Sequence, residues 1–134
     1  REQDRKAVPV GRVSHATWFS MSIDFLLSRE YDRSSYHCLH FAAEAWEHLT
    51  GDSRLREVDE HQFKAGRIAA LFRGMRRQSG PTVSPSIALM ETLSGEDHIG
   101  VCIRRRLLHI NAGGAQFLLI EALAAQYRNL RFYS

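Results

Sequence analysis

Cys38 is the residue of this chain whose surroundings most favour chemistry. It begins a strongly amphipathic segment and directly follows the polar stretch 30–37. A thiol at the N-terminus of a helix lies beside unpaired N–H groups and the positive end of the helix dipole, and both favour the thiolate. We therefore expect a lowered pKa for Cys38 and a nucleophilic sulfur at neutral pH.

A nucleophilic thiol also needs an imidazole that shares its proton and a polar group that orients the imidazole ring. His98 opens the segment 98–103, in which apolar residues alternate as in a half-buried strand. A hairpin with a turn of two or four residues would place His109 and Asn111 on the same face as His98, whereas a three-residue turn would reverse the faces. Gly100 leaves room on that face for His109. Either His109 or Asn111 could then orient His98.

Apolar spacing predicts the elements that would position these residues. The segment 38–51 has one continuous apolar stripe at helical spacing and ends at Gly51, which suits the end of a helix. The remaining predictions are helices over 18–29 and 60–77, a short apolar segment at 86–92, the strand pair 99–103 and 107–111, a loop at 112–115, a strand at 117–120, a helical turn or two at 121–127, and an edge strand at 130–133. Helices followed by short antiparallel strands indicate an α+β fold, with helices packed on one face of the sheet.

Length and composition restrict the class of protein. The chain has 134 residues, 44% of them apolar and 25% charged, which fits one compact domain. No apolar stretch is long enough to span a membrane, and two cysteines are too few for a disulfide scaffold or a cysteine-rich zinc module. We interpret residues 1–20 as a basic N-terminal arm or extension and 21–134 as the domain.

Arginine accounts for most of the net charge of +3. Its residues cluster at Arg73, Arg76 and Arg77 and again at 104–106, and such clusters could contact an anionic polymer. No aromatic side chains interleave with them as a base-stacking surface would require. We interpret the clusters as a solvated helix face and a hairpin tip, and expect no nucleic-acid partner.

Two segments together resemble a known family. YHCLHFAAEAWEHLTG, followed downstream by DHIGVCIRRRLLHI, is similar to the NlpC-type cysteine peptidases, papain-like enzymes that cleave bacterial cell-wall peptides. The resemblance implies a papain-like fold with N-terminal helices packed on a C-terminal antiparallel sheet. It also implies that Cys38 is the nucleophile, His98 the general base and His109 the orienting group. Tyr31 or Tyr36 would border the oxyanion site, with the backbone N–H of Cys38 as a second donor.

The chain departs from the family around the cysteine. His37 stands where Asp is usual, and Leu39 and His40 replace small residues. Such variation occurs among members found in bacteriophage tails, so the resemblance implies a tail-associated murein hydrolase or a protease of tail assembly. The expected partners are a peptidoglycan stem peptide or a protein substrate, together with other tail proteins. The expected location is the virion tail, or the bacterial cytoplasm during assembly.

Metal binding is a weaker interpretation of the same residues. Cys38, His40, His98 and His109 are zinc ligands by type, but residues two apart on a helix point roughly 200° away from each other. We therefore expect no metal and no other cofactor, and expect His37 and His40 to line the cleft or contact partners. Cys102 lies inside the alternating strand and is expected to serve packing.

Two further functional alternatives stay open. The same fold could serve as a catalytically dormant structural subunit of a phage tail tip. Alternatively, Cys38 to Phe41 resembles a motif of retinol-acyltransferase-type enzymes, which transfer acyl groups. In those enzymes the catalytic histidine precedes the cysteine, and His15 is the candidate here.

Overall fold

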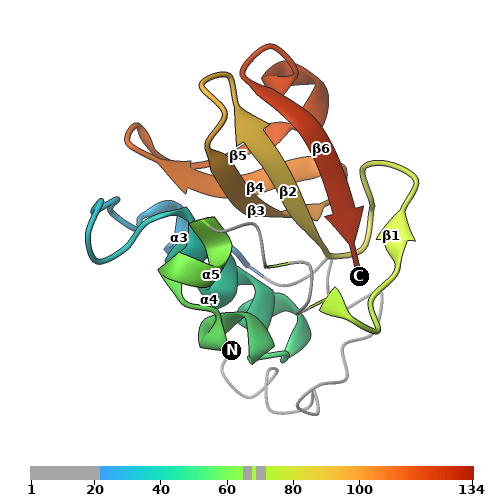
Figure 1. Cartoon of the computed structure of the whole chain (residues 1–134), viewed down its shortest axis with the longest axis horizontal. Helices are drawn as coiled ribbons and strands as arrows, with labels where there is room; N and C mark the ends of the chain where they lie inside the picture. Colours follow the sequence, from blue (N-terminus) through green and yellow to red (C-terminus); the bar gives the residue numbers. More distant parts are fainter. Residues whose placement is uncertain (1–21, 65–67, 69–71) are drawn as a thin grey trace.

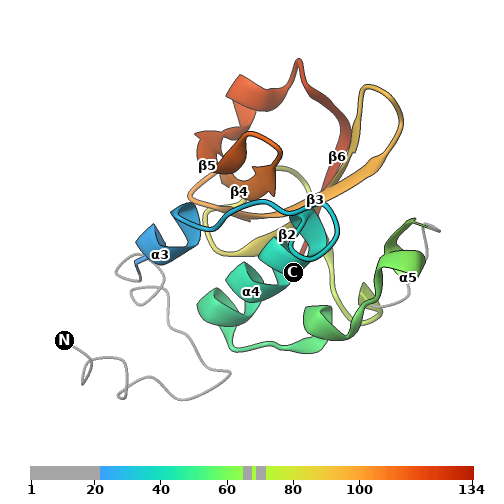
Figure 2. The same ribbon diagram turned by 90° about the vertical axis from the view of Figure 1, so that its left-hand side faces the viewer.

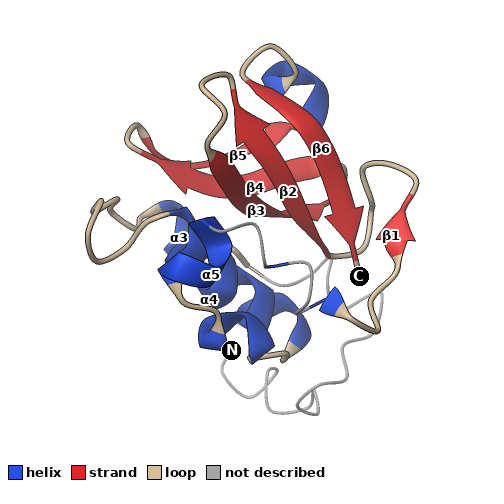
Figure 3. Cartoon of the chain, in the orientation of Figure 1, coloured by secondary structure: helices blue, strands red, loops and turns tan. Residues whose placement is uncertain are grey.

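The computed structural model describes residues 22–64, 68 and 72–134, arranged as helices packed beneath a curled sheet (Figure 1). The expected arm at 1–20, with His15 in it, lies outside the described residues. The elements confirm the mixed α+β class, because short helices come first and antiparallel strands follow (Figure 3). No helix of the described part is both long and apolar enough to cross a membrane.

One long helix dominates the helical layer. It is α4 (Cys38–Thr50), which ends at Gly51 in the left-handed conformation (φ 80°), as the sequence predicts. Its buried stripe packs against the neighbouring strands of the sheet, and Figure 2 shows α4 lying along it. The other helices of the described part are α3 (Asp24–Leu27), η1 (Arg54–Glu57), α5 (Glu60–Lys64) and η3 (Ile120–Leu123).

Two of the predicted helices are wrong in extent. The segment 18–29 contributes only the single turn α3 to the described part, because Leu26 is its one buried side chain. The prediction of a helix through residue 77 fails at its end, where Gly74 has a φ of 95° and the chain turns into a strand. A positive φ suits glycine and interrupts a right-handed helix. Residues 65–67 and 69–71 lie outside the described part.

The sheet has six strands in the order β1-β6-β2-β3-β4-β5, with every pair antiparallel. The strands are β1 (Arg77–Gln78), β2 (Ser86–Thr92), β3 (Asp97–Ile103), β4 (Arg106–Asn111), β5 (Gly114–Leu119) and β6 (Tyr127–Tyr133). The predicted loop at 112–115 is therefore shorter, because β5 begins at Gly114. The helical turn predicted over 121–127 is η3 and the turn after it.

The β3–β4 hairpin has the register that the two-residue turn predicts. Arg104 and Arg105 both have positive φ, 55° and 62°, which is the conformation of a type I′ turn. Pairing continues only as far as Val101 opposite Leu108, and beyond that point the two strands separate. Asn111 is therefore not paired with His98, although the parity of the register is the expected one.

The central strands β2, β3 and β4 are buried on both faces over most of their length. Ile99, Val101 and Ile103 belong to the cluster that contains the apolar stripe of α4. The opposite face of β3 is buried as well, in a second cluster that includes Cys102, Leu123 of η3, and Tyr127 and Phe132 of β6. The prediction of a half-buried strand is thus wrong for β3, because η3 and β6 cover the side that would otherwise face water.

Candidate active site

Two histidines cap the helix that carries Cys38. His37 is the N-cap residue, and its Nδ1 accepts a hydrogen bond from the Leu39 N–H at 3.3 Å. Nδ1 of His40 in turn accepts from the His37 N–H at 3.2 Å. The pair forms a capping box built from imidazoles, in which His37 accepts the hydrogen bond that Asp, Ser or Thr usually accepts at the N-cap. Of these two histidines, His37 is buried at the cap, whereas His40 is exposed.

The other two predicted histidines meet on the sheet. Nε2 of His98 lies 2.9 Å from Nδ1 of His109, and both side chains are buried. A Cβ at Gly100 would come within 3.0 Å of the Cβ of His109. The absence of a side chain at Gly100 therefore lets His109 reach His98, as the sequence suggested.

Two residues that the sequence did not indicate complete this pair. Oε1 of Gln116 lies 3.1 Å from Nε2 of His109, on the far side of the ring from His98. Tyr127 stacks on His98 with ring centroids 4.9 Å apart and 11° between the ring planes, and it meets His109 edge-on at 5.8 Å. Gln116 could have been found from the β4–β5 register, in which it lies directly opposite His109.

Asn111, the alternative orienting residue, contacts other groups. Its Nδ2 lies 3.5 Å from the hydroxyl of Tyr127, and its Oδ1 accepts a hydrogen bond from the N–H of Gly113 at 2.8 Å. Of the two candidates left open by the sequence, His109 is therefore the one that contacts His98.

The Cys38 thiol lies where β3 and β4 separate. Along the β2–β3 ladder, residue pairs that are hydrogen-bonded alternate with pairs that are not. The N–H of Thr92 donates to the Glu96 carbonyl, so Ile99 belongs to a pair that is not hydrogen-bonded, and its N–H points away from β2, toward β4. Because β4 has left the ladder at this level, that N–H faces the half-buried thiol of Cys38 instead. The sulfur is thus next to the residue that follows His98, and no hydrogen bond joins it to the His98 ring within the described residues.

Burial controls the protonation of these groups. It raises the pKa of Cys38 to about 11, and the N–H groups of Ile99, Leu39 and Cys38 itself offset only part of that rise. The expected lowering of the Cys38 pKa is therefore wrong, because loss of water around the sulfur outweighs the favourable helix N-terminus. Burial, with His109 nearby, lowers the pKa of His98 to about 3. Burial also lowers the pKa of His109 to about 4, although the hydrogen bond that His109 donates to Gln116 acts in the opposite direction. All three groups are neutral at pH 7.

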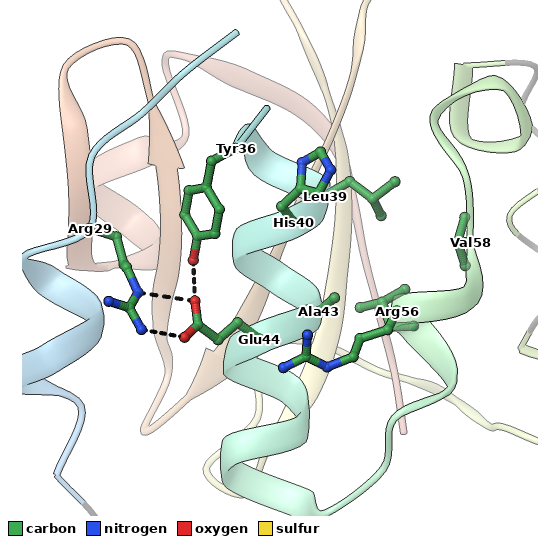
Figure 4. A pocket seen from close by; sticks show the side chains of 9 residues that line it. Arg29, Tyr36, Leu39, His40, Ala43, Glu44, Arg56 and Val58 are labelled. Atoms are coloured by element: carbon green, nitrogen blue, oxygen red, sulfur yellow. Dashed lines mark hydrogen bonds and ion pairs between the residues drawn. The ribbon is translucent and has the colours of Figure 1, made fainter. Parts of the chain in front are cut away.

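An open groove of about 570 Å³ runs along α4 from its first turn (Figure 4). Its apolar wall consists of Leu39, Ala43, Leu55 and Val58, and its polar wall consists of Arg29, Tyr36, His40, Glu44 and Arg56. The hydroxyl of Tyr36 donates to Glu44, which also binds Arg29 through two hydrogen bonds. Tyr36 therefore directs its hydroxyl into the groove. Tyr31, the other tyrosine candidate, packs half-buried against the main core.

Within the described residues, no group of three or more His, Cys, Asp or Glu side chains is arranged to hold a metal ion. In comparisons with known proteins, no family model, curated protein or solved structure matched the chain.

Proposed function

We propose that the chain is a papain-like cysteine peptidase, with Cys38 as nucleophile, His98 as general base and His109 as the group that orients His98. The observation that carries this proposal is the hydrogen-bonded line from Gln116 through His109 to Nε2 of His98. It leaves Nδ1 of His98 without a hydrogen bond in the described part of the chain. The amide that follows this histidine borders the Cys38 thiol.

In the proposed reaction, a substrate amide carbonyl enters beside the thiol. Nδ1 of His98 takes the proton from Cys38 while the sulfur attacks the carbonyl carbon. Because thiol and imidazole are both neutral at rest, the proton moves as the carbon–sulfur bond forms. The backbone N–H of Cys38, at the start of α4, is available to bind the oxyanion.

Collapse of the tetrahedral intermediate breaks the carbon–nitrogen bond. The His98 imidazolium gives its proton to the leaving amine, and a thioester remains on Cys38. A water molecule then loses a proton to Nδ1 of His98 and attacks the thioester carbon. The thiolate leaves, recovers the proton from His98, and a carboxylic acid is released.

The proposed substrate is a peptide of the bacterial cell wall, and the proposed setting is a phage tail, either as a murein hydrolase or as a protease of tail assembly. The resemblance around Cys38 and His98 is the source of this assignment. The groove along α4 adds support, because it combines an apolar wall with hydrogen-bonding groups beside the first helical turn. Such a surface suits an extended peptide with polar and apolar parts.

Digestion of purified peptidoglycan tests the proposal. The wild type is expected to release peptide fragments that mass analysis identifies, and Cys38→Ala is expected to reduce their release by roughly a thousand-fold or more. Cys102→Ala is the matched control, since that sulfur is buried in the second cluster, and it is expected to keep activity when circular dichroism shows it folded. Equal release by wild type and Cys38→Ala would remove Cys38 from the mechanism.

A dormant structural subunit of a phage tail tip is the second candidate function. It is favoured by the pKa of the Cys38 thiol, which is raised to about 11, whereas an activated nucleophile has a lowered pKa. Alkylation by iodoacetamide, followed from pH 6 to pH 10, separates the two functions. If the chain is a peptidase, stem peptides are expected to slow the alkylation of Cys38, because they occupy the space beside the thiol and acylate it. A structural subunit is expected to show the same slow, base-dependent rate with and without them.

A further inference from the structure

We infer that Gln116 is a positioning residue, which fixes the protons of both sheet histidines so that the reactive lone pair is on Nδ1 of His98. This inference rests on the proposed peptidase function and adds to it a residue that acts through His109. It starts from the contact between Oε1 of Gln116 and Nε2 of His109 at 3.1 Å.

The direction of the hydrogen bonds follows from what each atom can do. A carbonyl oxygen only accepts, so Nε2 of His109 must carry the proton that it donates to Gln116. A neutral imidazole has one N–H, so Nδ1 of His109 is an acceptor. Nε2 of His98 therefore donates across the 2.9 Å contact, and Nδ1 of His98 keeps its lone pair.

The opposite orientation of the Gln116 amide would reverse every step. An NH₂ group facing His109 would donate to Nε2, and His109 would then donate from Nδ1 to Nε2 of His98. The proton of His98 would be on Nδ1, where it could not accept the proton of a thiol. The orientation of the Gln116 amide thus decides whether Nδ1 of His98 can accept a proton.

A neutral acceptor also suits the burial of the pair. His98 and His109 are 6% and 0% exposed, and a carboxylate beside them would favour a buried imidazolium. The amide oxygen supplies a hydrogen bond without a charge. Tyr127 covers one face of the His98 ring by stacking on it.

Long-range ¹H–¹⁵N NMR of the full chain reads the imidazole protons without any turnover. In the wild type we expect protons on Nε2 of both histidines and none on Nδ1. Gln116→Met retains most of the side-chain volume and removes the acceptor, so it is expected to mix the two forms of His109. Gln126→Met is the matched control because Gln126 is exposed and contacts neither ring, and it is expected to leave the wild-type pattern unchanged.

The rate at which peptides are released from murein is the second measurement. Gln116→Met is expected to lower kcat by roughly ten- to a hundred-fold with KM within about twofold, the usual size of the effect when a supporting hydrogen bond is lost. Gln116→Glu keeps the acceptor and adds a charge, so it is expected to retain the proton pattern and to move the acidic limb of the pH profile upward by about one unit.

Each outcome decides one of the two proposals. Protons on Nδ1 in the wild type, or an unchanged proton pattern in Gln116→Met, would overturn the role of Gln116 whether or not the protein cleaves anything. The expected proton pattern in a wild type that releases no peptide would instead support the role of Gln116 in setting the protons and overturn the peptidase.

Discussion

The molecule contains two histidine pairs whose ring nitrogens form different kinds of hydrogen bond. On the sheet, His98 and His109 bind each other ring to ring, with 87° between the ring planes. At the start of α4, the rings of His37 and His40 also touch, with centroids 4.4 Å apart, but each accepts its hydrogen bond from the backbone. One pair is buried and joined to Gln116, and the other caps a helix.

The difference comes from the groups that surround each pair of rings. His37 and His40 are three residues apart around a helix start, where backbone N–H groups lack partners. His98 and His109 are eleven residues apart across the β3–β4 hairpin, beyond the last paired residues of these two strands, and there the two rings bond each other. A histidine pair therefore caps a helix or forms a ring-to-ring hydrogen bond according to the backbone beside it, and its sequence spacing alone does not reveal which.

The largest expected difference between the pairs is in their response to acid. Burial lowers the pKa of His98 and of His109 well below the ordinary value of 6.5. Below that pH, the two histidines therefore bind protons in the unfolded chain but stay neutral in the folded chain. Stability is then complete above about pH 6.5 and falls with pH below it. We expect a loss on the order of 2 kcal/mol for each of these histidines between pH 7 and pH 5, measured by urea unfolding.

The cap pair is expected to contribute less to this acid response. The pKa of His40 is lowered in the same direction, but its side chain is exposed. His40→Asn is therefore expected to keep most of the pH dependence, whereas His109→Asn is expected to remove about half. A stability that stays constant between pH 7 and pH 5 would contradict the burial of neutral histidines on the sheet.

A methyl group at Gly100 tests how tightly the sheet pair is packed. A Cβ added at Gly100 would lie 2.8 Å from both Leu107 Cδ1 and the Leu108 carbonyl oxygen, and the second of these is backbone. We expect Gly100→Ala to lower the free energy of unfolding by roughly 1–3 kcal/mol and to separate His109 from His98. Gly80→Ala, where the new methyl meets nothing within 4 Å, is expected to stay within about 0.5 kcal/mol of wild type in the same urea experiment.

The smallest expected effect is at the helix cap. His37→Ala removes the acceptor for the Leu39 N–H and is expected to cost about 1 kcal/mol in urea unfolding. His37→Asn restores a capping oxygen and is expected to return within about 0.5 kcal/mol of wild type. If both variants were equally destabilised, packing of the His37 ring rather than capping would be its contribution.

Local patterns predicted the parts of the fold that local physics decides. The apolar stripe and Gly51 fix α4, and the arginine turn fixes the parity of the β3–β4 hairpin. The helix predicted through residue 77 failed where Gly74 adopts a positive φ, since one glycine in a periodic segment does not show which conformation it takes.

The candidate site was predicted in part for the same reason. Cys38, His98 and His109 were found from residue type and order, and the two imidazoles meet. Gln116 and Tyr127 were missed because their contacts depend on the β4–β5 register and on how β6 returns across the sheet. The protonation of Cys38 was predicted with the wrong sign, because the burial of its sulfur is a property of the folded chain alone.

The burial of Cys38 has a consequence for the durability of the protein. Peroxides and disulfides react with thiolates far faster than with thiols, and a pKa of about 11 leaves very little thiolate at neutral pH. Cys102 is fully buried, so neither thiol of the chain is readily oxidised while the protein is folded. We expect the purified protein to keep both thiols reduced during storage in air, without added reductant.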